Sequence, residues 1–530
     1  MPSTSPAPRS SQTPAKVVPD AVRTELASLF SAAVDEHRTA GVTWAVIGGH
    51  GHDREILAHG AAGQRELLDG MPAPGSGPMD EATVSRIASM TKSFTAATIL
   101  ALRDEGALRL DDPISQYVPA AAGAFALAAD DREPTLRQLL SMNAGLVTDN
   151  PWGDRQEAMS PEDFDAMLRQ GLGAVHRPGT GFEYSNTGYV LLGRVIDEVT
   201  GRSYREEIRE RFLDPLGLRD TGWSDVEIDR DQLAVGHRVA DRTDATRFES
   251  VPLSGPGAYG AMAGLFSTVT DVARWVRFLA AADAPDAAQR PRGPLATASR
   301  REMQQMHRHQ MLPARRPQAS PEAGAADQST DAGSFDRIRG YGFGLVIEQF
   351  PDLGEVISHS GGYPGYGSFM AWHRDSGVGI VALANSKYAP AVPLGMQALR
   401  VLQRELPQLL APAPIPLGPC TRTAAEAALA WLRTDNSYLA DRFFADNMDP
   451  DVPRAERRRR LDAALAASGR SMQDIAQLVV DNAEVITPQQ LRWRLTAREE
   501  GQEDLVIDLL MDPRREALLQ ALNVSSIARR

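Results

Sequence analysis

The pair Ser89 and Lys92 is the residue combination in this chain best suited to covalent chemistry. The 530 residues include 56 lysines and arginines together, and only Lys16, Lys92 and Lys387 are lysines. A buried lysine can lose its proton and act as a base, whereas a guanidinium stays charged. On a helix, a three-residue spacing places both side chains on one face. The Ser89-x-x-Lys92 string therefore predicts a nucleophile beside its own base.

The same spacing also has a plainer interpretation, in which Ser89 opens a helix and Lys92 is a solvated side chain. Serine is common, so the chance that one of three lysines follows a serine at this distance is roughly one in five. The pair alone leaves both interpretations open, and the surrounding residues must decide between them.

The elements around Ser89 indicate how it would be positioned. Periodicity predicts a helix at 21–38, followed by two strands at 42–48 and 55–63. A second helix is predicted to begin at Ser89 and to run through Leu102. Ser89 then lies in a first helical turn, where free N–H groups and the helix dipole favour the negative charge that develops during acyl transfer.

Composition divides the chain into segments. Residues 1–20 are rich in proline and serine, and we expect a disordered tail there. A first domain is expected at 21–408, with a mobile insertion at 281–337. A proline-rich linker at 409–420 leads to a small α+β domain at 421–530, which carries no motif with assignable chemistry.

Strands are predicted at both ends of the first domain, with helical segments between them. Distant strands must then share one sheet. The later elements are predicted strands at 342–348, 355–358, 367–372 and 379–384 and a closing helix at 392–406. In the small domain, strands are predicted at 478–480, 491–496 and 504–510, and a helix or turn near 514–522.

Charge and composition exclude several classes of function. The net charge of −13 argues against nucleic-acid binding, and we interpret the one basic run, at 457–460, as a solvated helix face. The single cysteine, Cys420, excludes an intrachain disulfide. No stretch reaches the roughly 18 apolar residues of a membrane span. The N-terminus lacks the apolar core of a signal peptide, so we expect a cytoplasmic protein unless translation starts upstream.

A series of strings across 21–406 resembles a known family. In chain order they are RIASMTKSFTAATILALRDEGALRLDDPISQYVP, TLRQLLSMNAGL, RPGTGFEYSNTGYVLLGRVIDEVTG, DPLGLRDTGW, AGLFSTVTDVARW, YGFGLVIE, HSGGYPGYGSFM and VALANS. They resemble the penicillin-recognising serine hydrolases, above all the class C β-lactamase-like group with its family VIII carboxylesterases, D-aminopeptidases and D,D-peptidases. The resemblance implies an α+β fold, an antiparallel sheet flanked by helices with an all-helical insertion.

The resemblance implies a role for each residue that falls on a family motif. Ser89 is the nucleophile that becomes acylated, and Lys92 is its base or proton shuttle. Tyr184, in Tyr184-Ser185-Asn186, exchanges protons with the attacking hydroxyl and the leaving group. Asn186 hydrogen-bonds Lys92 and a polar group of the substrate.

The third family motif departs from true β-lactamases, because His359-Ser360-Gly361 stands where they carry Lys-Thr-Gly. The histidine form is usual among the esterase and aminopeptidase relatives. Histidine is mostly neutral at pH 7 and suits an uncharged ester better than lysine does. We expect His359 to line the site and to tune Lys92 and Tyr184 by hydrogen bonding.

The glycines after His359 are implied to complete the site. Family geometry places the oxyanion hole at the backbone N–H groups of Ser89 and Gly362, and Gly361 and Gly362 allow the main chain to approach the acyl group closely. The next aromatic residue, Tyr363, is interpreted either as a cavity wall or as the anchor of a turn.

The predicted reaction is acyl transfer through an acyl-enzyme, with no metal or cofactor. His-Glu-x-x-His and Gly-x-Ser-x-Gly strings are both absent. His359 and the missing export signal favour a carboxylesterase acting on small or medium esters. The alternatives are an amide hydrolase (D-aminopeptidase, D,D-carboxypeptidase or weak β-lactamase) and a binding or sensing module without turnover. The expected partner is a small-molecule ester or a D-amino-acid peptide, and a homodimer is left open.

Overall fold

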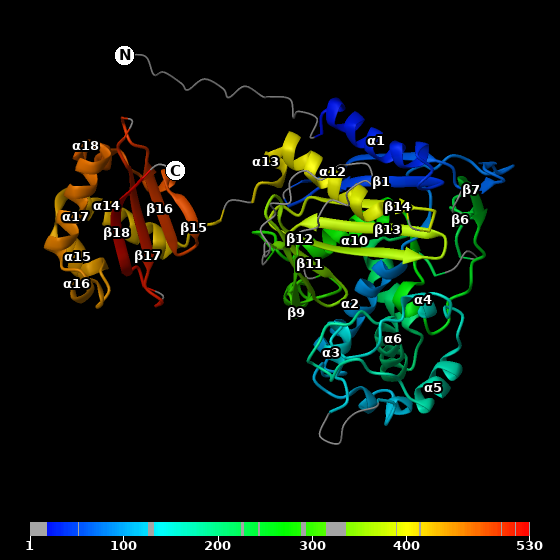
Figure 1. Cartoon of the computed structure of the whole chain (residues 1–530). Helices are drawn as coiled ribbons and strands as arrows, with labels where there is room; N and C mark the ends of the chain where they lie inside the picture. The colour runs from blue at the N-terminus through cyan, green and yellow to red at the C-terminus, as the bar shows by residue number, and fades with distance from the viewer. Residues whose placement is uncertain are drawn as a thin grey trace, which may run out of the picture. The chain divides into compact units, whose positions relative to one another are not determined.

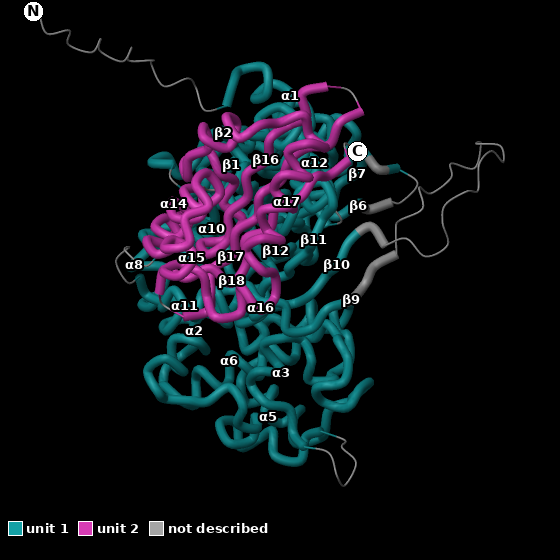
Figure 2. Tube along the Cα trace, turned by 90° about the vertical axis from the view of Figure 1, so that its left-hand side faces the viewer, with its two compact units in different colours: residues 1–412 teal, residues 413–530 magenta. Residues whose placement is uncertain are grey.

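The computed structural model describes residues 18–528 except 51, 126–131, 224–226, 242–243, 288–292, 314–334, 388, 413–414, 500 and 515. The chain divides into two compact units, residues 1–412 and 413–530, which Figure 2 distinguishes by colour. This division falls inside the segment expected to be a linker. Most of the expected disordered tail lies outside the described residues, as do residues 288–292 and 314–334 of the expected mobile insertion. The rest of that insertion includes a helix at Thr297–Met303 and a strand at Arg308–Pro313.

An antiparallel sheet forms the centre of the first unit (Figure 1). Its described strands are β1 (Gly41–Ile47), β2 (Ile56–Gly63), β9 (Arg308–Pro313), β10 (Phe335–Tyr341), β11 (Val346–Phe350), β12 (Gly354–Tyr363), β13 (Tyr366–His373) and β14 (Gly379–Ala384). The order β2-β1-β14-β13-β12-β11-β10-β9 joins the first strands of the chain to the last. The sheet is thus built from distant segments, as predicted. The strand predicted at 342–348 begins too early, because residues 342–345 form the turn between β10 and β11 and only 346–348 belong to β11.

Helices cover both faces of this sheet. The helices α1 (Asp20–Asp35) and α12 (Ala391–Glu405) pack on one face, and α2 (Thr91–Asp104) and α10 (Val269–Ala280) belong to the core on the other. Side chains along β1 alternate between the two faces. Val42, Trp44 and Val46 pack on the side of α1 and α12, and Ala45 and Ile47 pack on the side of α2 and α10. β1 is therefore buried on both sides.

A largely helical block lies between β2 and β9 in the chain and holds α2 at its centre. Its other α-helices are α3 (Leu136–Leu140), α4 (Asn150–Gly153), α5 (Pro161–Gln170), α6 (Asn186–Thr200), α7 (Tyr204–Ile208), α8 (Asp214–Leu216), α9 (Gly260–Ala263), α10 and α11 (Thr297–Met303). Its short strands are β3 (Leu67–Leu68), β4 (Met71–Pro72), β5 (Ser85–Arg86), β6 (His237–Asp241), β7 (Asp244–Ser250) and β8 (Phe266–Ser267). β5 pairs with β8 and places the segment before Ser89.

The second unit is a small α+β domain with its own core. Its helices are α14 (Pro419–Thr434), α15 (Ser437–Phe443), α16 (Met448–Asp451), α17 (Arg454–Ser468) and α18 (Met472–Gln477), after α13 (Pro407–Leu410) at the end of the first unit. Its antiparallel sheet runs β15 (Glu484–Thr487), β16 (Gln490–Leu495), β17 (Asp504–Met511) and β18 (Leu519–Ile527). The α+β class predicted for both units is confirmed.

Two local predictions in this unit need correction. The segment near 514–522, predicted as a helix or turn, bends at 513–514 and 516–517, but its last residues, Leu519–Leu522, begin the strand β18, which pairs with β17 from Asp504↔Ile527 to Met511↔Leu519. Tertiary pairing there overrides the local helix propensity of Leu, Ala and Gln. The strand predicted at 478–480 is instead irregular chain that enters a 3-10 turn. Among the described residues, no helix is both long and apolar enough to cross a bilayer.

Candidate active site

Ser89 lies in η1 (Ala88–Met90), a single 3-10 turn that leads directly into α2. The residue before it, Ala88, has a φ of 47°, in the left-handed region that a residue with a Cβ adopts only at a cost. Ser89 is half-buried and lines a cavity. The nucleophile expected in the first turn of a helix is therefore held in a tight turn just before it.

Lys92 is fully buried one turn further along the chain. Its Nζ lies 3.1 Å from Ser89 Oγ, 2.8 Å from Asn186 Oδ1 and 3.1 Å from the Met262 carbonyl oxygen. A neutral amine has two N–H donors and one lone pair. The amide and carbonyl oxygens can only accept, so they take both N–H groups. The lone pair is then left for the Ser89 hydroxyl, which is the arrangement that a base requires.

The electrostatics of Lys92 suit the same role. Burial lowers the pKa of Lys92 from 10.5 to about 7, against the opposing negative charges of Asp154 and Asp149. A large fraction of this side chain is therefore a neutral amine near neutral pH. Arginine in the same place would stay protonated.

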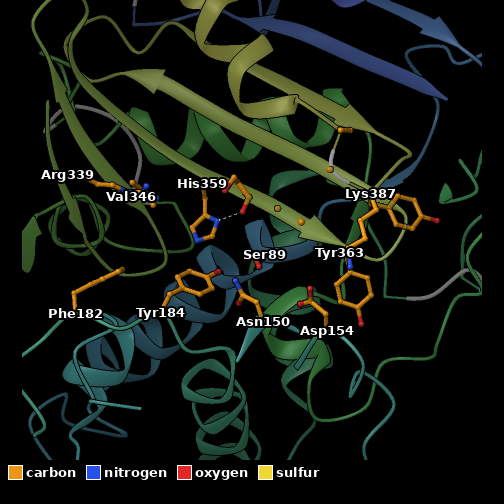
Figure 3. Close-up of a pocket in the computed structure, with 16 residues that line it drawn as sticks. Ser89, Asn150, Asp154, Phe182, Tyr184, Arg339, Val346, His359, Tyr363 and Lys387 are labelled. Atoms are coloured by element: carbon orange, nitrogen blue, oxygen red, sulfur yellow. Dashed lines mark hydrogen bonds between the residues drawn. The ribbon is translucent and has the colours of Figure 1, made fainter. Parts of the chain in front are cut away.

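The Tyr184 hydroxyl points toward Ser89 (Figure 3), and the Lys92 Nζ lies 5.0 Å from the centre of the Tyr184 ring. Burial raises the pKa of Tyr184, and a hydrogen bond with Ser89 only partly opposes this. The phenol therefore keeps its proton at neutral pH. It can donate that proton to a departing group, but it is not a phenolate base in the resting enzyme.

Asn186 is positioned by a carboxylate that sequence reasoning missed. Asp149 accepts hydrogen bonds from the backbone N–H groups of Asn186 and Thr187, at 2.7 and 2.9 Å, and from the Thr187 hydroxyl at 2.6 Å. It thus caps the start of α6 from a distant loop. The Asn186 Nδ2 donates to Asn150 Oδ1 at 2.8 Å. This second bond turns the Asn186 oxygen toward Lys92.

His359 is buried on β12 in a single tautomer. Its Nδ1 lies 2.7 Å from the carbonyl oxygen of Ser360, which can only accept, so Nδ1 carries the proton. Its Nε2 then accepts from the Tyr341 hydroxyl at 2.9 Å. Burial, followed by the nearby charge of Lys92, lowers the pKa of His359 to about 3. The hydrogen bonds expected from His359 to Lys92 and Tyr184 are replaced by these two, and His359 is neutral.

The glycines after His359 bring β12 against the turn that holds Ser89. A Cβ on Gly361 would lie 2.2 Å from Ser368 Oγ and 2.4 Å from the Ile87 carbonyl oxygen, so only glycine fits. A Cβ on Gly362 would meet nothing within 4 Å, and Gly362 lines the cavity. The main chain beside Ser89 is therefore open to a substrate at Gly362.

The cavity has a volume of about 490 Å³ and two chemically different ends. Figure 3 shows Arg339 and Phe182 on one side of Ser89, and Asp154 and Lys387 on the other. Burial raises the pKa of Asp154 to about 6, although the positive charge of Lys92 opposes this. The volume suits a small or medium-sized molecule.

One wall of the cavity is anchored by a buried ion pair, here called the Arg86 cluster and made of Arg86, Glu157, Ser254 and Tyr363. Arg86 Nη1 donates to Glu157 Oε1 at 2.6 Å, and both side chains are almost fully buried. The guanidinium lies 4.4 Å from the centre of the Tyr363 ring. Glu157 Oε2 accepts from the hydroxyls of Tyr363, at 3.0 Å, and Ser254, at 2.9 Å. Tyr363 is thus both a wall residue and an anchored one.

The structure brings the sequence-predicted residues together. Ser89, Tyr184, His359, Gly361 and Gly362 line the cavity, and Lys92 and Asn186 are buried beside Ser89. The residues that sequence reasoning missed are Arg86, Asp149, Asn150, Asp154, Glu157 and Tyr341. Arg86 and Tyr341 open two of the family strings, RIASMTK and YGFGLVIE, and the signal for the other four was the density of polar residues at 148–157, just after the TLRQLLSMNAGL string.

The fold and the site define a serine hydrolase of the penicillin-recognising type. A sequence model described as Beta-lactamase matches residues 26–403, so the chain belongs to the β-lactamase family, as its motifs predicted. Penicillin-binding protein 4* of Bacillus subtilis is 25% identical over 383 residues, which cover 69% of this chain and 72% of that protein.

Solved structures show the same fold. The octameric penicillin-binding protein homologue from Pyrococcus abyssi aligns with a TM-score of 0.56 and 20% identity over 94% of this chain and 99% of that one. The D-amino acid amidase from Ochrobactrum anthropi SV3, complexed with L-phenylalanine amide, aligns with a TM-score of 0.52 and 23% identity over 72% of this chain and 98% of that one.

Proposed function

We propose that this family member is a carboxylesterase that forms an acyl-enzyme at Ser89 and acts on small or medium esters. The observation that carries the proposal is the Lys92 amine, whose two N–H groups are occupied while its lone pair faces the Ser89 hydroxyl. A neutral His359 at the cavity supports an uncharged substrate, because it offers no fixed charge for a carboxylate.

The first half of the reaction follows from these contacts. Lys92 takes the Ser89 proton as Ser89 Oγ attacks the ester carbonyl carbon. The backbone N–H groups of Ser89 and Gly362 stabilise the oxyanion in the proposed hole. Tyr184, which holds its proton, gives it to the departing alkoxide, and the proton on Lys92 then restores the phenol. The alcohol leaves, and the acyl group stays on Ser89.

The second half uses the same groups in reverse. A water molecule takes the place of the alcohol and gives its proton to Lys92 through the Tyr184 hydroxyl. The hydroxide attacks the acyl carbon, and Ser89 leaves with the proton returned by Lys92. The carboxylic acid is released, and the resting protonation states are restored.

The experiment that tests the proposal combines intact mass and product release with p-nitrophenyl butyrate. Wild type is expected to give a product burst and the mass gain of one butyryl group. Ser89→Ala is expected to show neither. If wild type gives no mass gain and no turnover, the esterase proposal fails.

A second candidate is hydrolysis of amides that carry a free amino group. The Asp154 carboxylate on the cavity wall favours it, since a carboxylate can pair with an ammonium group. The structural likeness to a D-amino acid amidase is consistent with it. A kcat/KM that is higher for D-phenylalanine amide than for p-nitrophenyl butyrate would replace the ester proposal with this one. A third candidate is a binding module without turnover. It requires either that Ser89 is acylated and the acyl group is never released, or that Ser89 is not acylated at all.

A further inference from the structure

Arg339 supplies a positive charge to the active-site cavity, and the proposed reaction does not use it. The residue lies on β10 and lines the cavity, and its side chain is exposed, in contrast to the buried His359. Within the described residues, its guanidinium has no hydrogen-bond or ion-pair partner. A guanidinium presents five N–H donors in a planar fork, so this side chain can still bind an anion.

The carboxylate that faces Arg339 across the sheet is already paired. In the strand register, Arg339 stands opposite Glu348 of β11. Glu348, however, pairs with Arg337, two residues earlier on β10, at 3.1 Å between Glu348 Oε1 and Arg337 Nε. Two arginines thus share one carboxylate, which leaves a net positive charge at this edge of the cavity.

Arg339 lies at the end of the cavity where the leaving group departs. Figure 3 shows it on the same side of Ser89 as Tyr184, the proposed proton donor to the leaving group. Burial raises the pKa of Tyr184, and the positive charge of Arg339 opposes this, so the guanidinium is near enough to act on the phenol. An alcohol that takes the Tyr184 proton therefore leaves on the side of Arg339.

Apolar side chains complete this end of the cavity. Phe182, which is half-buried, and Val346, which is buried, line it together with Arg339 (Figure 3). Their surfaces favour contact with a hydrocarbon body. The opposite end differs, because Lys387 and the Asp154 carboxylate lie there together. The leaving-group end thus combines an apolar surface with a positive charge.

We propose that Arg339 selects esters whose alcohol part carries a carboxylate. The body of the alcohol lies against Phe182 and Val346, and its carboxylate accepts hydrogen bonds from the Arg339 guanidinium. This assignment rests on the proposed function and narrows its substrate class to esters of hydroxy acids or phenolic acids. The uncharged surroundings that the neutral His359 provides apply to the ester bond itself, whereas Arg339 acts on the far end of the leaving group.

The test compares two esters that differ in charge at one position, 4-carboxyphenyl butyrate and its neutral counterpart 4-carbamoylphenyl butyrate. We would measure kcat/KM for both esters with wild type, Arg339→Gln and Arg339→Glu. Comparing the ratio of the two values between variants cancels the different leaving abilities of the two phenols. Arg400→Gln is the matched control, since it removes an exposed positive charge from α12, on the other face of the sheet.

In Arg339→Gln, kcat/KM for the carboxylate ester is expected to fall by about fivefold or more, while that for the carbamoyl ester changes by less than about twofold. Arg339→Glu is expected to lower the ratio further, and Arg400→Gln is expected to leave it unchanged. A ratio that neither Arg339 variant changes would overturn this proposal, while hydrolysis of both esters would leave the proposed function standing.

A binding measurement separates failure of this proposal from failure of the proposed function. Isothermal titration of Ser89→Ala with 4-hydroxybenzoate and with the neutral 4-hydroxybenzamide requires no turnover. The carboxylate is expected to bind more tightly than the amide, and Arg339→Gln in the same background is expected to abolish the difference. If no ester is hydrolysed, equal binding of the two compounds, or binding of neither, would overturn the assignment of Arg339.

Discussion

Two buried cations lie six residues apart beside the active-site cavity, in opposite surroundings. Arg86 contacts a carboxylate, at 2.6 Å from Glu157, and lies between the rings of Phe266 and Tyr363. Lys92 hydrogen-bonds neutral oxygens, those of Ser89, Asn186 and Met262, and contacts no carboxylate of the described residues; we call these four residues the Lys92 cluster. The chain thus buries one positive charge with a counterion and the other without one.

The difference separates structural support from chemistry. Pairing holds the charge of Arg86 in place and fixes Tyr363 in the cavity wall. The absence of a contacting carboxylate lets burial lower the pKa of Lys92 to about 7, which makes a base. In each cluster the type of cation suits its partners: Arg86 is paired with a carboxylate, and Lys92 is surrounded by neutral groups. Each cluster can be disrupted by a substitution that leaves the other intact.

The largest expected effect is that of Lys92→Arg. A guanidinium cannot take the proton of Ser89, so kcat is expected to fall by about 10³-fold or more. Stopped-flow measurement of the acylation burst with p-nitrophenyl butyrate checks this. Lys387→Arg, at the rim of the same cavity, is the matched control and is expected to lose less than about tenfold. Equal losses in the two variants would contradict the assignment of Lys92 as the base.

Breaking the Arg86 cluster is expected to act on stability first. Glu157→Gln leaves a buried guanidinium without its counterion, so the free energy of unfolding is expected to fall by about 3 kcal/mol. Urea denaturation followed by fluorescence measures it. The acidic limb of the pH–rate profile should stay in place, because Glu157 is not among the charges that act on Lys92. A free energy of unfolding that the substitution leaves unchanged would show that the Arg86–Glu157 pair does not stabilise the fold.

Tyr363→Phe tests the same cluster with a smaller change. It removes one hydrogen bond to Glu157 and keeps the ring over Arg86, so the expected loss is about 1 kcal/mol in the free energy of unfolding. Ser254→Ala removes the other hydroxyl from the same carboxylate oxygen and is the matched comparison. KM for the ester is expected to rise only in Tyr363→Phe, since only Tyr363 lines the cavity.

The smallest expected effect is a shift of pH dependence in Asp154→Asn. The negative charge of Asp154 favours protonated Lys92, so its removal lowers the pKa of Lys92 further. Activity in wild type should fall as the pH drops below about 7, because Lys92 gains a proton. In Asp154→Asn this acidic limb should move to lower pH by about half a pH unit. A kcat/KM profile from pH 5 to 9 measures it, and a shift to higher pH would contradict the stated sign.

The sequence could predict the parts of the site that lie on strongly patterned elements. The strand bounds expected at 379–384 match β14, and those expected at 367–372 fall within β13; both strands carry family strings. Ser89, Lys92, Tyr184 and His359 are recognisable because their spacing is local or lies inside such strings. Their proximity then follows from the fold.

The rest depends on contacts that no local pattern records. Asp149 caps α6 across 37 residues, and Glu157 pairs with Arg86 across 71. The Ser360 carbonyl oxygen decides the tautomer of His359, and Tyr341, which donates to its other ring nitrogen, lies on β10, a strand that the sequence pattern did not predict. In the second unit, Leu519–Leu522, the end of a segment predicted as a helix or turn, belong to β18 because they pair with the edge of β17.

The left-handed backbone of Ala88 has a consequence for when this chain becomes reactive. A short peptide with this sequence would relax at Ala88, since the conformation costs roughly 1–2 kcal/mol. Only the packed chain holds it there, with β12 pressed against the turn at Gly361. The lowered pKa of Lys92 likewise exists only once the side chain is buried. The proposed nucleophile and base are therefore assembled by the final packing of the first unit, and we expect Ser89 to be inert in a nascent or partly folded chain.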